Sequence, residues 1–302
     1  MKYLVIGAGG TGGCIAGYMK RAGKDVSLIA RGEHLKAIKE NGLTIDKPND
    51  RFTVLIPACT MEDYNETPDV IFVCVKGYSI DDVIPFIQRV GSDNTIVIPI
   101  LNIYGTGGVM QKSLPNMLVT DGCIYIGSQI GGPGFIKMNG EIFRVVYGVR
   151  NKEEYRPELE VIETDLKDSG ITPLLTDDIR RDALKKFSYV SPAATCGQYY
   201  DCNSDRMQVE GKERETLKSL IHEIEILAEA MGIDFGEDMV DTNLKILANL
   251  APDSATSMQR DVRAGKVSEI DGLIHGVVRM GRDAGVELPT YALISEALKD
   301  LK

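Results

Sequence analysis

Three glycines near the N-terminus have the spacing of a dinucleotide-binding turn. Gly7, Gly9 and Gly12 fit the pattern G-x-G-x-x-G, between the apolar run Lys2–Ile6 and an apolar-periodic run that reaches Met19. A strand, a glycine turn and a helix start in this order are the context that gives the pattern its meaning. Gly7 allows the tight turn, Gly9 lets the backbone approach a pyrophosphate, and Gly12 lets the helix pack closely on its strand.

The start of the predicted helix supplies the positive end of this site. Gly10 and Thr11 lie in its first turn, where backbone N–H groups point outward and the helix dipole favours anions. We therefore expect these residues to bind the phosphates of a dinucleotide. The alternative is a glycine turn that holds no ligand.

The residues after the next strand indicate which dinucleotide is bound. Asp25–Ile29 is the second predicted strand, and NAD-binding units usually carry Asp or Glu at its end. This chain has Ala30, Arg31 and Gly32 there. Because a guanidinium binds a 2′-phosphate and a carboxylate would repel it, the sequence predicts NADP(H), with Arg31 as the ligand and Lys36 as a helper. The alternative is an ordinary exposed arginine.

Two polar residues follow later strands of the same predicted sheet. Lys76 follows the buried run Asp69–Val75, and Asn102 follows the strand Thr95–Ile100. Ligands in open α/β sheets lie at the carboxyl ends of the strands, so Lys76 is expected to face the cofactor. Asn102 is expected to orient a nicotinamide ribose or a substrate oxygen. The alternatives are a lysine whose amine extends to solvent and an asparagine in a turn.

The reduction of a carbonyl by hydride also needs a proton donor for the nascent alkoxide. No histidine is a candidate, so a lysine or tyrosine comes next. Lys185 and Lys186 precede the uncharged run Phe187–Ala194. A lysine in this position is either the solvated end of a helix or a buried acid, and its spacing alone favours the solvated end.

A second polar set lies further along the chain. Thr256 and Ser257 either cap a helix or bind a carboxylate, and Glu269 begins a predicted long helix. An acid in the first turn of a helix is by default a partner of the helix dipole.

The composition is that of a globular protein with room for two cores: 302 residues, 43% hydrophobic and 26% charged. The net charge of −10 argues against a nucleic-acid partner. No apolar run is long enough to span a bilayer, and we expect no signal peptide because a strand begins at once. The cysteines are Cys14, Cys59, Cys74, Cys123, Cys196 and Cys202, and they show no metal-ligand spacing. We therefore expect a reduced cytoplasmic protein that holds no metal.

The chain changes its pattern near Thr176. Before that residue, strands alternate with helices, which predicts an α/β fold with a Rossmann-type doubly wound sheet. Cys123–Gln129 and Ile142–Val149 are predicted to extend this sheet in antiparallel fashion. The other elements expected in this half are helices at His34–Asn41, Ser79–Val90 (capped by Ser79) and Glu153–Ser169, and strands at Phe52–Ile56 and Ile171–Leu175.

After Thr176 only helical patterns remain. We therefore predict an NADP-binding domain over residues 1–176 and an all-helical substrate and catalytic domain over 177–302, with the active site in the cleft between them. The helices expected are Asp178–Cys196, Gly211–Met231, Glu237–Asn249, Ser257–Ala264, Glu269–Ala284 and Tyr291–Leu301.

Several of these motifs together resemble the ketopantoate reductase (2-dehydropantoate 2-reductase) family over nearly the whole chain. The stretch from Ser257 to Glu269 is the most specific, because its residues match in both type and spacing. The matching segments are Ile6–Gly13, Ala30–Leu35, Val75-Lys76, Asn102 with Gly105-Thr106, Lys186-Phe187, Ser257-Met258, Asp261–Arg263 and Glu269–Gly272.

The resemblance implies NADPH-dependent reduction of 2-dehydropantoate to pantoate in pantothenate synthesis. It implies Lys186 as the general acid and Glu269 as a carboxylate that contacts the substrate. It further implies Ser257 as a substrate ligand, and Asn102 and Lys76 as residues of the cofactor and active site.

The chain departs from the family where the substrate is bound. The family usually has two asparagines on the helix after the catalytic lysine, whereas this chain has Val190 and Ala194. Its asparagine after the fifth strand lies between Leu101 and Ile103, whereas the family has glutamine before it and glycine after it. Lost amides weaken recognition of a substrate hydroxyl or carboxylate. The alternatives to 2-dehydropantoate are therefore another branched 2-oxo acid, or a non-catalytic NADP(H)-sensing module. A homodimer is compatible with the helical half.

Overall fold

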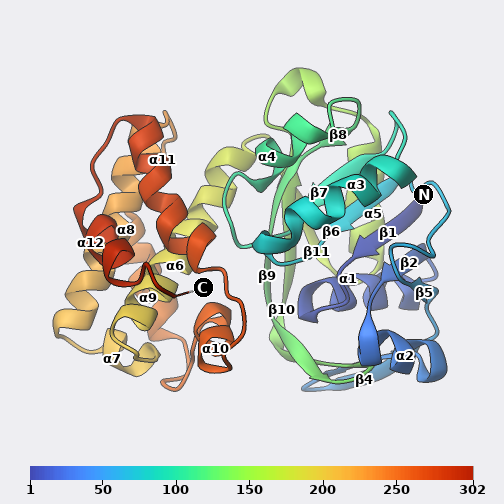
Figure 1. Ribbon diagram of the computed structural model, residues 1–302, viewed down its shortest axis with the longest axis horizontal. Helices are drawn as coiled ribbons and strands as arrows, with labels where there is room; N and C mark the ends of the chain where they lie inside the picture. The colour runs from blue at the N-terminus through green and yellow to red at the C-terminus, as the bar shows by residue number, and fades with distance from the viewer. Residues whose placement is uncertain (302) are drawn as a thin grey trace. The chain divides into compact units, whose positions relative to one another are not determined.

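The computed structural model describes residues 1–301, which form two compact units (Figure 1). The first unit contains residues 1–101 and 105–179. The second contains residues 102–104 and the described chain from Arg180 onward. The short segment 102–104 follows a strand of the first unit but packs with the helices of the second.

The first unit contains the predicted doubly wound sheet, which confirms the fold class. Six parallel strands lie in the order β5-β2-β1-β6-β7-β8. All residues of β6 and β7 are buried, as expected for parallel strands covered on both faces. The strands are β1 Lys2–Ile6, β2 Asp25–Ile29, β5 Ala58–Cys59, β6 Val70–Val73, β7 Ile96–Pro99 and β8 Leu118–Val119, and the helices between them are α1 Gly10–Arg21, α2 Gly32–Asn41, α3 Ile80–Val90 and α4 Thr106–Ser113.

A second sheet in this unit corrects one prediction. The segments expected as an antiparallel extension of the first sheet do pair with each other, but as β9 and β10 of a separate sheet. Its order is β11-β10-β3-β4, with β9 also on β10. The strands are β3 Leu43–Lys47, which was not predicted, β4 Asp50–Val54, β9 Asp121–Gly132, β10 Phe135–Gly148 and β11 Thr172–Leu175.

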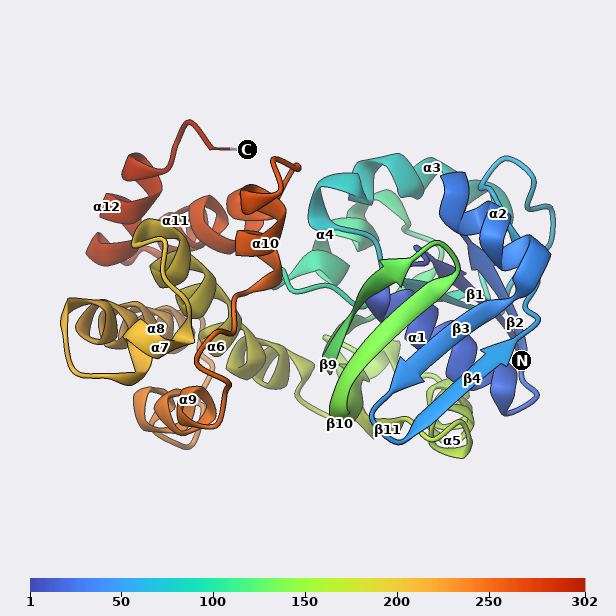
Figure 2. The ribbon, with the colours of Figure 1, turned by 90° about the horizontal axis from the view of Figure 1, so that it is seen from below.

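Helix α1 explains why a second sheet forms here, because it contacts strands of both sheets (Figure 2). A Cβ atom on Gly13 would lie 2.0 Å from Cδ1 of Ile136 in β10, and one on Gly17 would lie 2.4 Å from Cδ1 of Ile45 in β3. These two glycines therefore let the second sheet lie directly on the helix. Ile136, Met138 and Val145 of β10 are buried in the core that includes α1.

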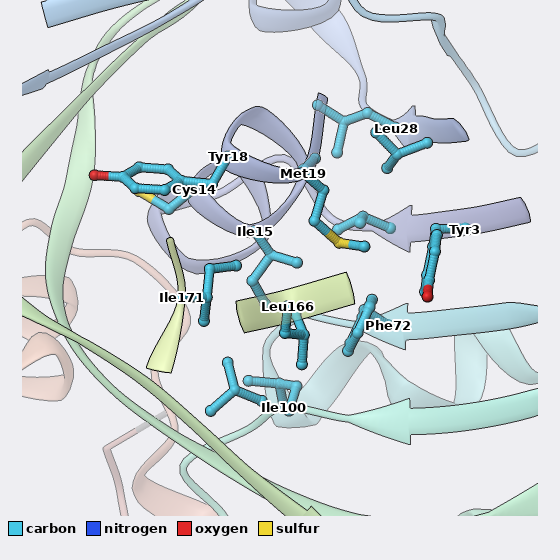
Figure 3. Close-up of a cluster of buried hydrophobic side chains, with 14 of the residues drawn as sticks. Tyr3, Cys14, Ile15, Tyr18, Met19, Leu28, Phe72, Ile100, Leu166 and Ile171 are labelled. Carbon is cyan, nitrogen blue, oxygen red and sulfur yellow. The ribbon is translucent and has the colours of Figure 1, made fainter. Parts of the chain in front are cut away.

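The main core of the first unit surrounds α1 (Figure 3). Ile15 and Met19 of α1 belong to the same buried cluster as Tyr3 of β1 and Phe72 of β6. Leu166 joins it from α5, Glu158–Asp168. The helix predicted over Glu153–Ser169 is thus shorter, because a 3₁₀ turn at Lys152–Glu154 and then Pro157 precede it.

The second unit is helical, and no strand occurs between residues 180 and 301. Helix α8 contacts α7, α9, α11 and α12. The helix expected over Glu269–Ala284 instead contains a π-helical segment followed by an α-helix, and α7 was not predicted. The elements are α6 Ile179–Tyr199, α7 Ser204–Gln208, α8 Lys212–Ala230, α9 Met239–Ala248, α10 Ser257–Arg263, the π-helix Asp271–His275, α11 Gly276–Ala284 and α12 Pro289–Ala297.

Candidate active site

The glycine turn between β1 and α1 has the shape that a pyrophosphate needs. Gly7 has a φ of +101°, and a Cβ there would lie 2.9 Å from the carbonyl oxygen of Cys74. A Cβ on Gly12 would lie 2.1 Å from the carbonyl oxygen of Gly7. A Cβ on Gly9, in contrast, would have no atom within 4 Å. Gly7 and Gly12 thus serve the packing of the turn, while Gly9 borders open space.

The N-terminus of α1 faces this turn without a side-chain cap. Gly10 packs on β9, because a Cβ there would lie 2.7 Å from the carbonyl carbon of Ser128. Thr11 follows in the first helical turn and is half-buried. Backbone N–H groups of an uncapped first turn are natural donors to phosphate. The residues present therefore fit a bound dinucleotide.

Two cationic side chains follow the strands that flank β1. Ile6 pairs with Ile29 of β2 and with Val73 of β6, so the carboxyl ends of these strands lie at one edge. Arg31, two residues after β2, is exposed and precedes the first residue of α2. Lys76, three residues after β6, is half-buried and precedes a 3₁₀ turn at Gly77–Ser79. Both sequence-predicted cofactor residues are thus at the edge where the glycine turn begins.

The 3₁₀ turn also corrects a smaller prediction. Ser79 precedes α3 but makes no side-chain capping hydrogen bond. The chain enters α3 through the 3₁₀ turn, and Ser79 belongs to that turn.

In the second unit, Lys186 and Asn102 are brought together. The ammonium of Lys186 on α6 donates a hydrogen bond of 2.7 Å to Oδ1 of Asn102, which is 84 residues away in sequence. Both side chains are half-buried. This contact places the predicted proton donor beside the predicted amide, which spacing alone could not establish.

Lys185, its neighbour, has a different environment. Its ammonium forms an ion pair of 2.7 Å with Glu237. Because successive residues on a helix point about 100° apart, one lysine faces Asn102 and the other faces a surface carboxylate. Neither lysine opens the helix, because α6 begins at Ile179.

The segment that carries Asn102 is held by apolar contacts within the second unit. Tyr104 packs against Phe187, with ring centroids 6.1 Å apart. Ile103 lies against Gly272 so closely that a Cβ there would be 2.3 Å from Cδ1 of Ile103. Glu269 is three residues before Gly272 and only 4% exposed. The predicted carboxylate is therefore buried, at the start of the segment that packs beside Asn102.

Ser257 is positioned by a well-formed helix start. Thr256 and Gln259 form a capping box, in which Oγ1 of Thr256 accepts from the backbone N–H of Gln259 at 3.3 Å and Oε1 of Gln259 accepts from the N–H of Thr256 at 2.9 Å. Gln259 also packs against Gly197, which lies about three turns beyond Lys186 on α6. Ser257, the first residue of α10, is half-buried.

The two apolar replacements on α6 have different surroundings. Val190 lies one turn after Lys186 on the same face, is half-buried and packs against the helical core. Ala194 is fully buried in that core. An apolar side chain thus stands one turn from the predicted proton donor.

Asp121 of β9 is a buried polar residue that was not predicted from the sequence. Its carboxylate accepts from the backbone N–H of Gly107 at 2.7 Å and pairs with Arg150 at 3.5 Å. Burial raises the pKa of Asp121, although Arg150 and the amides of Gly107 and Gly108 oppose this. It fixes the start of α4, which follows the 102–104 segment. No local signal in the sequence marks this role.

No helix in residues 1–301 is long and apolar enough to cross a membrane. Among the same residues, no three His, Cys, Asp or Glu side chains gather in a manner that could hold a metal ion.

The first unit has a parallel sheet with a glycine turn at the uncapped N-terminus of α1, and the second unit has a lysine–amide pair. This combination is typical of a dinucleotide-dependent oxidoreductase. The comparisons with known proteins identify the family. The model of ketopantoate reductase PanE/ApbA matches residues 3–152, and the model of its C-terminal domain matches residues 178–302. The chain belongs to the ketopantoate reductase family and is an NADP-dependent oxidoreductase acting on CH–OH groups.

Individual relatives are distant in sequence. The chain is 27% identical to the uncharacterized oxidoreductase YkpB of Bacillus subtilis (strain 168), over 91% of this chain and 90% of that protein. It is 24% identical to a 2-dehydropantoate 2-reductase of Aquifex aeolicus (strain VF5), over 99% and 96%. A solved D-mandelate dehydrogenase, in a ternary structure with NADH and anilino(oxo)acetate, is 20% identical, with a TM-score of 0.88 over 99% of this chain and 97% of that one. This last likeness shows the fold alone.

Proposed function

We propose that this enzyme reduces 2-dehydropantoate to pantoate with NADPH, a step of pantothenate biosynthesis. The hydrogen bond between Lys186 and Asn102 carries the proposal, because it holds a lysine, the proposed proton donor, beside an amide in a chain of the ketopantoate reductase family. The name of the Aquifex aeolicus relative supports the choice of substrate.

In the proposed mechanism, NADPH supplies the hydride when it is bound. Gly7, Gly9, Gly10, Thr11 and Gly12 hold its pyrophosphate through the turn and the first helical N–H groups.

Arg31 binds the 2′-phosphate, and Lys76 contributes positive charge at the same edge of the sheet. A guanidinium matches a phosphate in a bidentate manner, whereas an ammonium acts as a point charge. The two residues therefore have separate roles: Arg31 selects NADPH over NADH, and Lys76 strengthens the binding of both.

Lys186 acts as the general acid. Its Nζ donates a proton to the substrate oxygen as the adjacent carbon is reduced. Oδ1 of Asn102 accepts another of the three N–H bonds of the ammonium and so holds it in one orientation. The amide nitrogen of Asn102 remains a donor toward a substrate or cofactor oxygen.

Glu269 and Ser257 bind the substrate in this proposal. Buried carboxylates are hydrogen-bonded, and a carboxylate accepts several hydrogen bonds, so a hydroxyl of the substrate is proposed as one donor to Glu269. The Ser257 hydroxyl, at the start of α10, donates to the substrate carboxylate. Together with Lys186, they surround an anion that carries a hydroxyl group.

A panel of substrates tests this proposal, and the absorbance of NADPH measures the turnover of each substrate. The panel contains 2-dehydropantoate, its analogue without the hydroxyl group (3-methyl-2-oxobutanoate), and 2-oxo-2-phenylacetate. The proposal predicts the largest kcat/KM for 2-dehydropantoate, by about a hundredfold or more, because the analogue lacks the hydroxyl group that Glu269 is proposed to bind. Equal or larger kcat/KM with either other acid would contradict it.

Val190 favours a second candidate, the reduction of a different branched 2-oxo acid. A half-buried valine one turn from Lys186 offers a methyl surface where an amide would bind a polar group. This candidate predicts that the hydroxyl-free acid is the better substrate. Val190→Asn should then shift the ratio of kcat/KM values toward 2-dehydropantoate, while Val209→Asn, at an exposed site just after α7, leaves the ratio unchanged.

A further inference from the structure

The C-terminus of α6 ends in a turn that brings two cysteines together. The backbone N–H of Cys202 donates to the carbonyl of Gly197 at 3.0 Å, and the N–H of Asp201 donates to Gln198 at 3.4 Å. Asp201 has a φ of 45° and occupies the left-handed position. These bonds define a Schellman motif, in which the residue after the left-handed one packs against the last full turn of the helix. Here those two positions are Cys202 and Cys196, which belong to the same buried cluster.

The two thiols have unequal access. Cys196 is fully buried, and its Sγ donates to the carbonyl of Glu213 on α8 at 3.2 Å. Cys202 lines a polar hollow of about 500 Å³, together with Tyr200, Asp205, Arg206 and Lys212. Cys202 is itself buried, at 8% exposure, but it borders the hollow and Cys196 does not, so a small polar reagent meets Cys202 first. Cys196 is the other cysteine of the helical unit.

The surroundings make Cys202 the more acidic of the two. The neighbouring Cys196 thiol lowers the pKa of Cys202, and the Arg206 guanidinium lowers it further, while burial, Glu213 and Asp205 oppose them. The same contact and burial raise the pKa of Cys196. Arg206 is itself held by Glu213 at 2.8 Å, so its charge stays beside the hollow.

Other thiols of the chain have the opposite tendency. Burial raises the pKa of Cys14 to about 12 and also raises the pKa of Cys74 and of half-buried Cys59. Because the thiolate is the reactive form, these cysteines are the less reactive group.

We propose that Cys202 and Cys196 form a peroxide-reactive thiol pair, a modification site separate from the candidate active site. The Cys202 thiolate attacks one oxygen of hydrogen peroxide, the O–O bond breaks, and the leaving hydroxide takes a proton to become water. The resulting sulfenic acid is then attacked by the sulfur of Cys196, which gives up its proton. The S–O bond breaks, a second water leaves, and a disulfide remains, so that two thiols lose two electrons to one peroxide.

A chain of hydrogen bonds links this pair to the predicted substrate ligand Ser257. The carbonyl oxygen of Cys202 accepts from Nε2 of Gln259 at 2.8 Å. Oε1 of Gln259 in turn accepts from the backbone N–H and the hydroxyl of Thr256, at 2.9 and 3.0 Å. A disulfide pulls the Cys202 backbone toward α6, and Gln259 carries that displacement to the start of α10.

Mass spectrometry tests the pair directly. Trypsin releases both thiols in one peptide, Phe187–Arg206, because no lysine or arginine lies between its ends. After peroxide treatment and alkylation, this peptide should be two hydrogens lighter than its unalkylated reduced form and carry no alkyl group. Chymotryptic cleavage after Tyr199 or Tyr200 should leave the two fragments linked until a reductant is added.

Three variants separate the roles of the sulfurs. Cys196→Ser should stop at a sulfenic acid on Cys202 that dimedone captures, whereas Cys202→Ser should give neither adduct nor disulfide. Cys59→Ser is the matched control and should oxidise like the wild type. Circular dichroism checks that each variant is folded, and Cys202→Ala replaces Cys202→Ser if the latter is not. Equal oxidation of Cys59, or an alkylated Phe187–Arg206 peptide after peroxide, overturns the proposal.

The link to Ser257 is tested separately by enzyme kinetics, and this test rests on the proposed function. Oxidation should raise KM for the 2-oxo acid about two- to tenfold, the equivalent of one weakened hydrogen bond, and a reductant should reverse the change. NADPH affinity should stay the same. An unchanged KM in an enzyme that has formed the disulfide overturns the link. Absence of turnover in the reduced enzyme refutes the proposed function and leaves the peptide result to decide the thiol pair.

Discussion

The two units of this enzyme prepare their candidate sites by different physical means. The first unit uses the backbone: a turn made of glycines and the uncapped N–H groups of α1. The second uses side chains held across long sequence separations, such as Lys186 against Asn102. A site built from the backbone depends on glycines, which have no side chain to block it. A site built from side chains depends on single functional groups. The variants below test this distinction.

Removal of Lys186 should have the largest effect. Lys186→Ala should lower kcat by about 10²–10⁴-fold, on the order of 3–5 kcal/mol, because the proposed proton donor is lost. NADPH affinity should hardly change. Steady-state kinetics with the best acid of the panel measure the first quantity, and fluorescence titration measures the second.

Lys185→Ala is the matched control, because its ammonium pairs with Glu237 instead. This variant should keep most of the wild-type kcat. If both alanine variants behave alike, the proton donor lies elsewhere, and Lys76 is the next candidate.

Two glycines of one turn should respond differently to the same added methyl group. Gly12→Ala places a Cβ 2.1 Å from the Gly7 carbonyl oxygen. It should therefore lower the free energy of unfolding by about 3 kcal/mol, at the upper end of overpacking costs. Gly9→Ala meets no atom and should change it by about 1 kcal/mol or less, the cost of alanine at a helix cap.

The distinguishing measurement for this pair is NADPH binding to folded protein. Gly9→Ala should weaken it by about tenfold or more, because the methyl group occupies space that the pyrophosphate needs. A Gly9→Ala protein that binds NADPH like the wild type would show that the cofactor does not approach the turn.

Arg31→Ala tests the one side chain on which the cofactor choice rests. It should weaken NADPH binding by about 10- to 100-fold, as expected for a hydrogen bond to a charged group worth about 1.5–3 kcal/mol. NADH binding should change little. Lys39→Ala, in the last turn of the same helix α2 and also exposed, is the charge-matched control. Equal affinity of the wild type for both cofactors would refute the assignment.

The smallest expected effect concerns the helix that carries Ser257. Thr256→Ala removes the capping box of α10 and should lower the free energy of unfolding by about 1 kcal/mol. Ser79→Ala, before α3, should cost nothing measurable, since Ser79 makes no capping bond. Urea unfolding compares the two. Similar losses in both variants would show that the Thr256 side chain does not stabilise α10.

Prediction from the sequence succeeded where the signal is local. The strand, glycine turn and helix at the N-terminus follow one another directly in the chain. The steric requirements of this motif therefore act between residues that are close in sequence. The helical half was evident from periodicity, although the π-helical segment Asp271–His275 interrupts one predicted helix. Ser79 occupies the N-cap position of α3 as predicted, but its side chain makes no capping hydrogen bond, because the residue type does not guarantee the geometry.

Prediction failed for contacts between distant segments. The predicted antiparallel pairing of β9 and β10 is confirmed. The two strands belong to a separate sheet, however, because Gly13 and Gly17 leave room for that sheet on α1. Asp121 was missed because its partners, Gly107 and Arg150, gather around it only in the folded unit.

The amino-acid sequence by itself determined the doubly wound sheet, the glycine turn and the helical second half. These features depend on backbone conformations and side-chain periodicities that operate over a few residues. The tertiary structure alone decided which lysine of the pair 185–186 meets Asn102, and that a second sheet covers α1. The physical reason is that a contact between residues 84 positions apart is selected by the packing of whole elements, and no neighbour in the chain encodes it.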